Sequence, residues 1–144
     1  MFVLATKRMR LATFQTDYWQ LRDAEECHAK NPDEFWIPPL EERINLQRGQ
    51  SAKLIFDIEA TDEDGNVIVT GERMWVTVLE RVGDLYVGIL ENQPASLYPD
   101  SDAYLTMGAE IPFGVNHVTD IANPPVEFVK WQLSQPPDRN WPRE

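Results

Sequence analysis

The segment Gly71–Pro94 reads GERMWVTVLERVGDLYVGILENQP and decides the expected fold. Its two runs, 74–82 and 85–91, are rich in β-branched, aromatic and aliphatic residues, which favour strands. Gly83 and Asp84 separate the two runs, and a two-residue connection with glycine is typical of a tight hairpin. Because an isolated hairpin is marginally stable in water, we expect other strands of the chain to cover its apolar face.

The stretch before the hairpin predicts a further strand. From Ser51 to Ala60, apolar residues alternate with charged ones, which is the period of two expected of a half-buried strand. An acidic turn at 62–66 follows, and Val67–Thr70 begins the return toward the hairpin. The residues that we expect on the core face are Ala52, Leu54, Phe56, Ile58 and Ala60, with Met74, Val76 and Val78 of the hairpin.

Another strand is expected after the polar loop 95–103. The segment 105–113 echoes 46–56, since each has a leucine, a glycine three residues later and then a strand that ends in phenylalanine. We expect Gly49 and Gly108 to supply a positive φ at these turns. Pro112 lacks an amide donor, which predicts an edge or bulged strand. Residues 116–121 predict a short strand or a single helical turn.

The N-terminal part predicts a helix that starts at Thr16 or Asp17 and ends at Asn31-Pro32. Cys27 and His28 would lie in its last turn. Residues 1–14 predict an edge strand or an ordered arm, and 40–46 predict a short helix. The helical spacing rests on Phe14, Tyr18, Leu21 and Ala24.

Together these patterns predict an α+β fold with an N-terminal helix and a small, strongly bent, mainly antiparallel sheet, as in an SH3-like barrel or half-barrel. We expect residues 1–123 to form a single domain that ends at Asn123-Pro124-Pro125. Residues 124–144 would form a C-terminal tail that contains proline and tryptophan. Within this tail, residues 126–133 fit either a strand or a helix.

The charge of the chain restricts its partners. The 144 residues include 13 Lys and Arg against 24 Asp and Glu, a net charge of −11, and most of the acids lie between Asp17 and Asp120. Such a body repels a phosphate backbone, so we expect no nucleic acid and favour a basic protein partner. Cys27 is the single cysteine, and Met1–Leu4 is too short for the apolar part of a signal peptide. We therefore expect a cytoplasmic protein without membrane segments.

Motifs for metal, phosphate or dinucleotide binding are absent from the sequence, so we expect no metal and no cofactor. Cys27 and His28 are adjacent, and on a helix they point about 100° apart. One alternative is a small-ligand-binding or hydrolytic enzyme that uses His117 and Asp120 together with Glu72 and Arg73. In the structural alternative, Asp120 turns the backbone and His117 packs at a strand edge.

The face of the hairpin opposite the core is a candidate interaction surface. Arg73 and Trp75 lie on it, and the next strand adds Tyr86 or Leu85, depending on the register. Trp, Tyr and Arg dominate protein interfaces. This face is covered either by the chain's own helices or tail, or by a partner. The candidate binding residues are Arg73, Trp75, Tyr86, Asn92, His117 and Asp120.

Residues 35–121 contain several short motifs, which are Phe35-Trp36-Ile37-Pro38, Glu41-Glu42-Arg43, Leu46-x-x-Gly49, Lys53-Leu54-Ile55-Phe56, Glu72-Arg73-Met74-Trp75-Val76-x-Val78, Tyr86-x-Gly88-x-Leu90-x-Asn92-x-Pro94, Gly108-x-x-Ile111-x-Phe113 and His117-Val118-x-Asp120-Ile121. As a set they resemble the YegJ-like small domains, a bacterial family of which some relatives are associated with toxin-immunity loci. The resemblance implies a small β-rich domain and transfers no catalytic residues. At the strand entries this chain has Gly49-Gln50 and Gly108-Ala109, where the family usually has Gly-Asp.

Charge, composition and resemblance together predict a non-enzymatic, acidic protein-binding module of a bacterium, an immunity or accessory protein for a basic partner. The enzyme described above is the first alternative. A structural homodimer, with the second sheet face or the tail exchanged between protomers, is the second.

Overall fold

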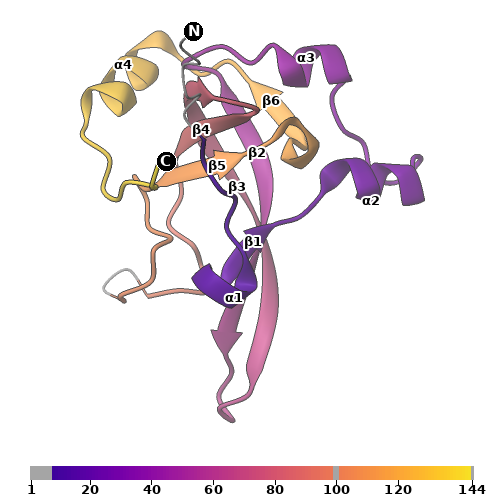
Figure 1. Ribbon diagram of the computed structural model, residues 1–144, viewed down its shortest axis with the longest axis vertical. Helices are drawn as coiled ribbons and strands as arrows, with labels where there is room; N and C mark the ends of the chain where they lie inside the picture. The colour runs from indigo at the N-terminus through magenta and orange to yellow at the C-terminus, as the bar shows by residue number, and fades with distance from the viewer. Residues whose placement is uncertain (1–7, 99–100, 144) are drawn as a thin grey trace, which may run out of the picture.

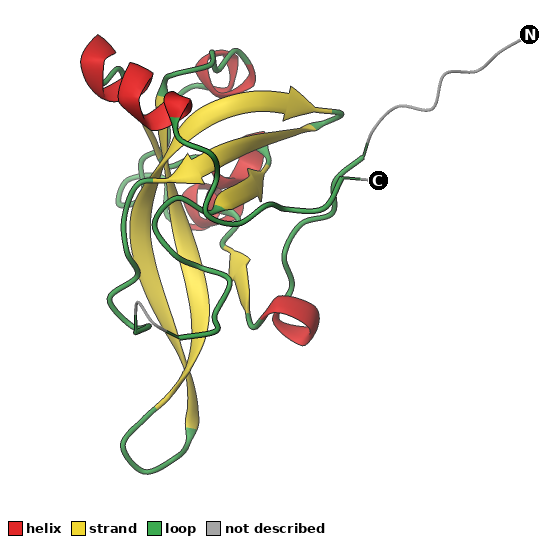
Figure 2. Cartoon of the chain, turned by 90° about the vertical axis from the view of Figure 1, so that its left-hand side faces the viewer, coloured by secondary structure: helices red, strands yellow, loops and turns green. Residues whose placement is uncertain are grey.

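The computed structural model describes residues 8–98 and 101–143, and it shows the predicted α+β fold (Figure 1). Its antiparallel sheet curls into a half-barrel (Figure 2). The strand order is β1-β2-β3-β4-β5, and β6 pairs with β2 as well. In chain order the elements are α1 (Phe14–Asp17), β1 (Trp19–Leu21), α2 (Ala24–Lys30), α3 (Leu40–Ile44), β2 (Ser51–Thr61), β3 (Val67–Val82), β4 (Leu85–Leu90), β5 (Glu110–Phe113), the 3-10 turn η1 (Val115–His117), β6 (Asp120–Ala122) and α4 (Val126–Ser134).

The central hairpin is confirmed. Val82 pairs with Leu85 across the turn, and Gly83 adopts a positive φ of 61°. The register slips between Val78 and Glu80, where an irregularity bends β3. Such a bend tightens the curl of a sheet, which agrees with the half-barrel form.

The core fills the concave side of the sheet. The predicted core positions of β2 and β3 are buried, except that Ala60 is half-exposed. Tyr86 stacks on Phe113 with 5.3 Å between ring centroids, which joins β4 to β5. Further core residues are Trp19, Leu90, Leu105, Ile111, Val118 and Trp141.

The prediction of one N-terminal helix from residue 16 or 17 to residue 31 was wrong. α1 is a single turn whose N-cap is Thr13, and it ends at Tyr18, where φ is 67°. The chain then forms β1, which pairs with β2 over Phe56–Ile58, and α2 starts anew with Asp23 as its N-cap. Pairing with β2 buries Trp19 almost completely, and this tertiary gain outweighs the local helical spacing. The predicted end of the helix is confirmed, since α2 ends at Lys30.

The turn predictions hold in detail. Gly49 and Gly108 have φ values of 93° and 94°. β5, which contains Pro112, is the last strand in the sheet order, as expected of a strand that lacks a donor. Residues 116–121 combine both alternatives, since η1 ends at His117 and β6 starts at Asp120.

The C-terminal segment forms a helix and then returns to the sheet. α4 contacts β3, and a Cβ added at Gly49 would lie 2.9 Å from Val129 Cγ1 of this helix. Thr77, on the second face of β3, is fully buried, so this part of that face is covered. Beyond α4, Trp141 joins the core.

Independent folding of residues 1–123 stays a prediction. The apolar run at 2–5, for which the sequence predicts an edge strand or an ordered arm, lies outside the described residues.

Candidate binding cavity

The candidate binding residues of the sequence divide between surface and interior. Trp75, Lys53 and Asp120 lie in one row across β3, β2 and β6, and the Lys53 ammonium is 5.4 Å from the Trp75 ring. Asn92 Oδ1 accepts a hydrogen bond from the Trp75 amide, which fixes the chain after β4 beside β3. The Arg73 guanidinium lies 5.3 Å from the Phe35 ring. These side chains are exposed or half-buried and remain available as a surface.

Tyr86 and His117 are buried, so neither offers a surface to a partner. The Tyr86 hydroxyl donates to Arg43 O and accepts from the Leu46 amide, which holds α3 against the core. His117 Nδ1 accepts the amide proton of Gly114 at 2.9 Å. Burial lowers the pKa of His117 to about 4. Both residues stabilise the fold.

The four residues of the enzyme alternative do not form a catalytic group in the described structure. The Glu72 carboxylate accepts hydrogen bonds from the amides of Ala95 and Ser96. Burial raises the pKa of Glu72, but these bonds and that of the Ser96 hydroxyl outweigh it and lower the pKa overall. Asp120 accepts from the following amide, and His117 bonds to Gly114. Among the described residues, no hydrogen bond links Glu72, Arg73, His117 and Asp120.

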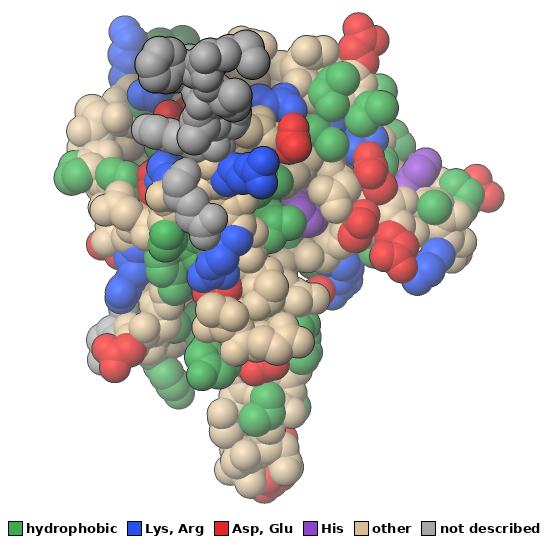
Figure 3. All heavy atoms as spheres, in the orientation of Figure 1, with side chains coloured by type: hydrophobic (Ala, Val, Ile, Leu, Met, Phe, Trp, Pro, Cys, Tyr) green, Lys and Arg blue, Asp and Glu red, His purple; other side chains and the backbone are tan. Residues whose placement is uncertain are grey.

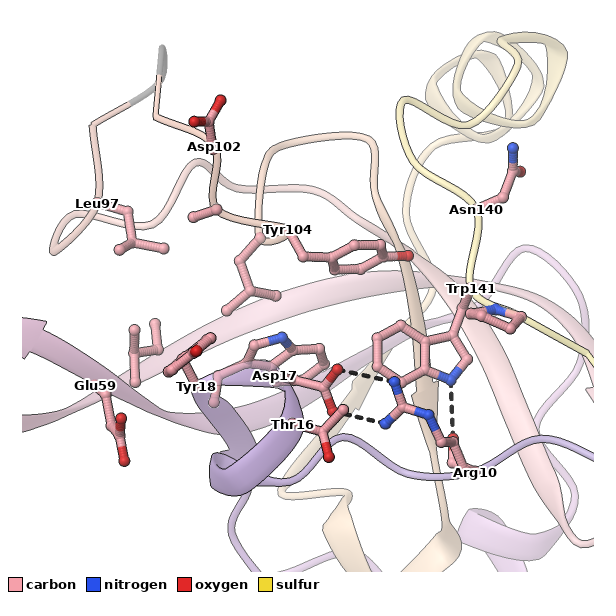
Figure 4. Close-up of a pocket in the computed structure, with 15 residues that line it drawn as sticks. Arg10, Thr16, Asp17, Tyr18, Glu59, Leu97, Asp102, Tyr104, Asn140 and Trp141 are labelled. Atoms are coloured by element: carbon pink, nitrogen blue, oxygen red, sulfur yellow. Dashed lines mark hydrogen bonds and ion pairs between the residues drawn. The ribbon is translucent and has the colours of Figure 1, made fainter.

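A cavity of about 460 Å³ opens beside α1 and β1 (Figure 4). It is assembled from four parts of the chain: residue 10, α1 with the start of β1, residues 97 and 102–105, and residues 140–142. Ile58 and Glu59 of β2 complete the wall. The volume lies within the range typical of small-molecule and side-chain pockets.

Aromatic rings form one wall of this cavity. Trp19 stacks on Tyr104, with 6.4 Å between centroids, and meets Trp141 edge-on at 5.8 Å. Tyr104 and Trp141 are 5.1 Å apart in a second edge-on contact. The Tyr104 hydroxyl donates to Glu110 O, and burial raises the pKa of this phenol, so it stays protonated. Trp19 Nε1 is buried without a hydrogen-bond acceptor among the described residues, which leaves an unpaired donor in the wall.

A guanidinium is already bound at this wall. The carbon Cζ of Arg10 lies 4.5 Å from the Trp141 ring, and its two terminal nitrogens donate to Asp17 at 2.6 and 2.9 Å. The backbone carbonyl of Arg10 accepts from Trp141 Nε1 at 2.9 Å. The hydrogen bond from Arg10 lowers the pKa of Asp17 despite partial burial. The aromatic ring and the carboxylate thus form a site that suits a planar cation.

Tyr18 lies at the mouth of the cavity in a left-handed backbone conformation. Among the described residues it is the one residue other than glycine with a positive φ, and its side chain is 67% exposed. This conformation destabilises a tyrosine by roughly 1–2 kcal/mol. Because the ring is exposed, its packing offsets little of this cost. The turn between α1 and β1 requires the conformation, and it leaves an aromatic ring at the opening.

The C-terminal wall of the cavity is fastened by one buried carboxylate. Glu110 of β5 accepts the Trp141 amide at 2.8 Å and both terminal nitrogens of Arg143 at 2.8 and 3.0 Å. The hydrogen bond to Glu110 raises the pKa of Arg143. Glu110 therefore fixes the position of the Trp141 ring.

The sequence does not predict this cavity. Tyr104 and Trp141 are far in the chain from Arg10, Asp17 and Tyr18, and no local motif connects these three parts. The sequence holds one sign of the cavity: aromatic residues follow the basic N-terminal segment, and an aromatic residue lies close to the C-terminus.

Other kinds of site find no support in the described part of the chain. It contains no group of three or more His, Cys, Asp and Glu side chains that could hold a metal ion. In the same ranges no helix is both long enough and apolar enough to cross a membrane. Acidic side chains gather around α2 and α3 on the face shown in Figure 3.

Comparisons of the chain with models of protein families, with curated proteins and with solved structures found no match.

Proposed function

We propose that this chain is a non-enzymatic, acidic protein-binding module whose cavity takes a basic side chain of a partner protein. The observation that carries the proposal is the Arg10 guanidinium, held against Trp141 and Asp17. A site that binds a cation of its own chain has the ring and the carboxylate that a partner's arginine or lysine needs.

The charge around the opening supports a basic partner. Arg10 pairs with Asp17, and Glu59 and Asp102 leave the residues around the cavity with one cation against three carboxylates, so a basic side chain of the partner would take the place of Arg10. The chain as a whole carries −11. Opposite charge raises the rate of encounter and makes binding sensitive to salt. A bacterial immunity or accessory role belongs to the same proposal, because some relatives in the family that the chain resembles are associated with toxin-immunity loci and an immunity protein covers the surface of another protein. The cytoplasmic location proposed with it rests on the single cysteine and on the short apolar run at the N-terminus.

The proposal can be tested by NMR titration with a capped peptide of alternating arginine and glycine at low salt. We expect the indole signals of Trp19 and Trp141 to shift, while those of the exposed Trp36 and Trp131 serve as references in the same spectrum. A peptide of alternating glutamate and glycine is the control ligand. Equal shifts of all four indole signals, or none, would refute the proposal.

Variants at the opening separate the cavity from general charge attraction. E59Q and D102N should each weaken binding about two- to fivefold, the range of a partly exposed ion pair. E63Q, at the hairpin turn between β2 and β3, removes the same charge far from the cavity and is the matched control. If E63Q weakens binding as much as D102N does, the peptide is held by net charge and the cavity is not its site.

A further inference from the structure

β2 and β3 extend beyond their neighbours as a two-stranded arm (Figures 1 and 2). β1 pairs with β2 as far as Ile58, and β4 pairs with β3 from Val76 onward. The arm ends at the turn between Thr61 and Val67, which pair with each other. In the described structure the outer edge of β3 therefore has no neighbouring strand near the tip of the arm.

The backbone of this edge points outward at every second residue. The Trp75 amide donates to Asn92, and the Trp75 carbonyl accepts from the Glu91 amide, so both groups of Trp75 point away from β2. Because the direction alternates along an antiparallel strand, the same holds for Val67, Val69 and Gly71. Within residues 8–98 and 101–143, no hydrogen bond reaches the outward groups of these three residues.

The side chains of this edge are apolar and exposed. Val67 is 69% exposed, Ile68 43% and Val69 57%. Natural proteins protect free edges with charges, prolines or a covering element, and the run from Val67 to Gly71 has neither charge nor proline. An edge of this kind promotes pairing with another strand.

We propose that the edge strand of the arm pairs antiparallel with the same strand of a second copy, about a two-fold axis at Val69. In this register Val69 faces Val69 of the other copy, and Val67 faces Gly71. The backbone amides and carbonyls that point away from β2 in one copy therefore lie opposite those of the other copy. The pairing adds about six hydrogen bonds between copies. It is an isologous interface that does not rest on the proposed function, although Glu59 of the cavity wall is the β2 partner of Val69.

The charges of the arm favour a second copy in this orientation. Asp62, Glu63 and Asp64 lie at the tip, whereas Arg73 lies toward the root and is exposed. The charge of Arg22, which also lies there, is paired with that of Asp57. Antiparallel pairing brings each acidic tip toward Arg73 of the other copy. Parallel pairing would place the two acidic tips side by side. The charges along the two strands thus favour a second copy of the chain, in antiparallel orientation, as the partner of this edge.

Sedimentation velocity over a concentration series tests the proposal. The V69P variant removes an outward amide and leaves the bonds to β2 intact, so we expect dimerisation at least about tenfold weaker than in the wild type. T61P is the matched control, because the Thr61 amide points to the opposite edge of the arm. We expect this variant to dimerise like the wild type. A wild type that is monomeric up to its solubility limit, or a dimer that V69P does not weaken, would overturn the proposal.

Two further measurements keep the test decisive if a proline variant fails to fold. V69K leaves the backbone unchanged and places two like charges at the two-fold axis, so it should also give a monomer. In the wild type, hydrogen exchange of the Val69 amide should slow as protein concentration rises, while exchange at Thr61 stays constant. An exchange rate of Val69 that does not depend on concentration would contradict the interface.

Discussion

We expect the protein to lose stability on mild acidification, and replacing the buried His117 by asparagine should remove most of this loss. His117 Nδ1 accepts the Gly114 amide proton, so this nitrogen cannot take up a proton without losing that bond. Burial lowers the pKa of the imidazole to about 4, although the carboxylates of Asp23 and Glu25 in α2 raise it. Arg43 of α3 donates to Val115 O and so places a cation against η1.

The sign and size of the effect follow from linkage. In the unfolded chain the imidazole binds a proton near pH 6.5, and in the folded chain near pH 4, so between these values the unfolded state holds more protons. Stability therefore rises with pH across this window and falls on acidification. The full shift corresponds to about 3 kcal/mol, of which about 1 kcal/mol is lost between about pH 7.5 and pH 5.5. Below about pH 4, carboxylates with lowered pKa values, such as those of Asp17 and Glu72, add their own losses.

Urea unfolding, followed by tryptophan fluorescence in steps from about pH 7.5 to pH 4.5, measures this dependence. The Oδ1 of asparagine can replace Nδ1 as acceptor for the Gly114 amide, so H117N should fold. Its free energy of unfolding should fall by about 2 kcal/mol less than that of the wild type between about pH 7.5 and pH 4.5. H28N, which removes the chain's other histidine, is the control and should keep the wild-type slope. If H117N retains the full slope, the buried imidazole is not its source and the reasoning fails.

Three other substitutions test individual contacts. Y18G relieves the left-handed backbone and should raise the free energy of urea unfolding by about 1 kcal/mol, while peptide binding weakens; a loss of stability would contradict the assigned strain. G88A places a Cβ 2.9 Å from Val76 Cγ2 and should lower Tm by an amount equivalent to about 2 kcal/mol. E110Q removes the charge that holds the C-terminal segment, so proteolysis there should accelerate and stability fall by about 2 kcal/mol. An unchanged Trp141 indole signal would argue against this role of Glu110.

The sheet could be predicted from the sequence because its determinants are local. Alternation along residues 51–60 fixes which face of β2 is buried, and Gly83-Asp84 fixes the hairpin register. The positive φ at Gly49 and Gly108 follows from the same local chemistry. Each of these features depends on residues close together in the chain.

The N-terminal helix was mispredicted for the opposite reason. The spacing of Phe14, Tyr18 and Leu21 fits a helix, but Trp19 gains more by pairing beside Ile58, 39 positions further along the chain. No pattern within residues 14–24 shows that β2 has an unpaired edge at that point. The second face of the sheet was open to alternatives because α4, which contacts β3, comes from the other end of the chain.

The cavity depends even more on distant segments, and this has a thermodynamic consequence. Its aromatic wall needs Trp141, which Glu110 holds through a backbone bond and through Arg143. A ligand that contacts the Trp141 ring binds only chains in which this C-terminal segment is docked, so binding must stabilise the docked segment by the same free energy. The arm has no such dependence, since β2 and β3 pair with each other along its length. Loss of the C-terminal segment should therefore abolish binding at the cavity while the edge of β3 keeps its capacity to pair.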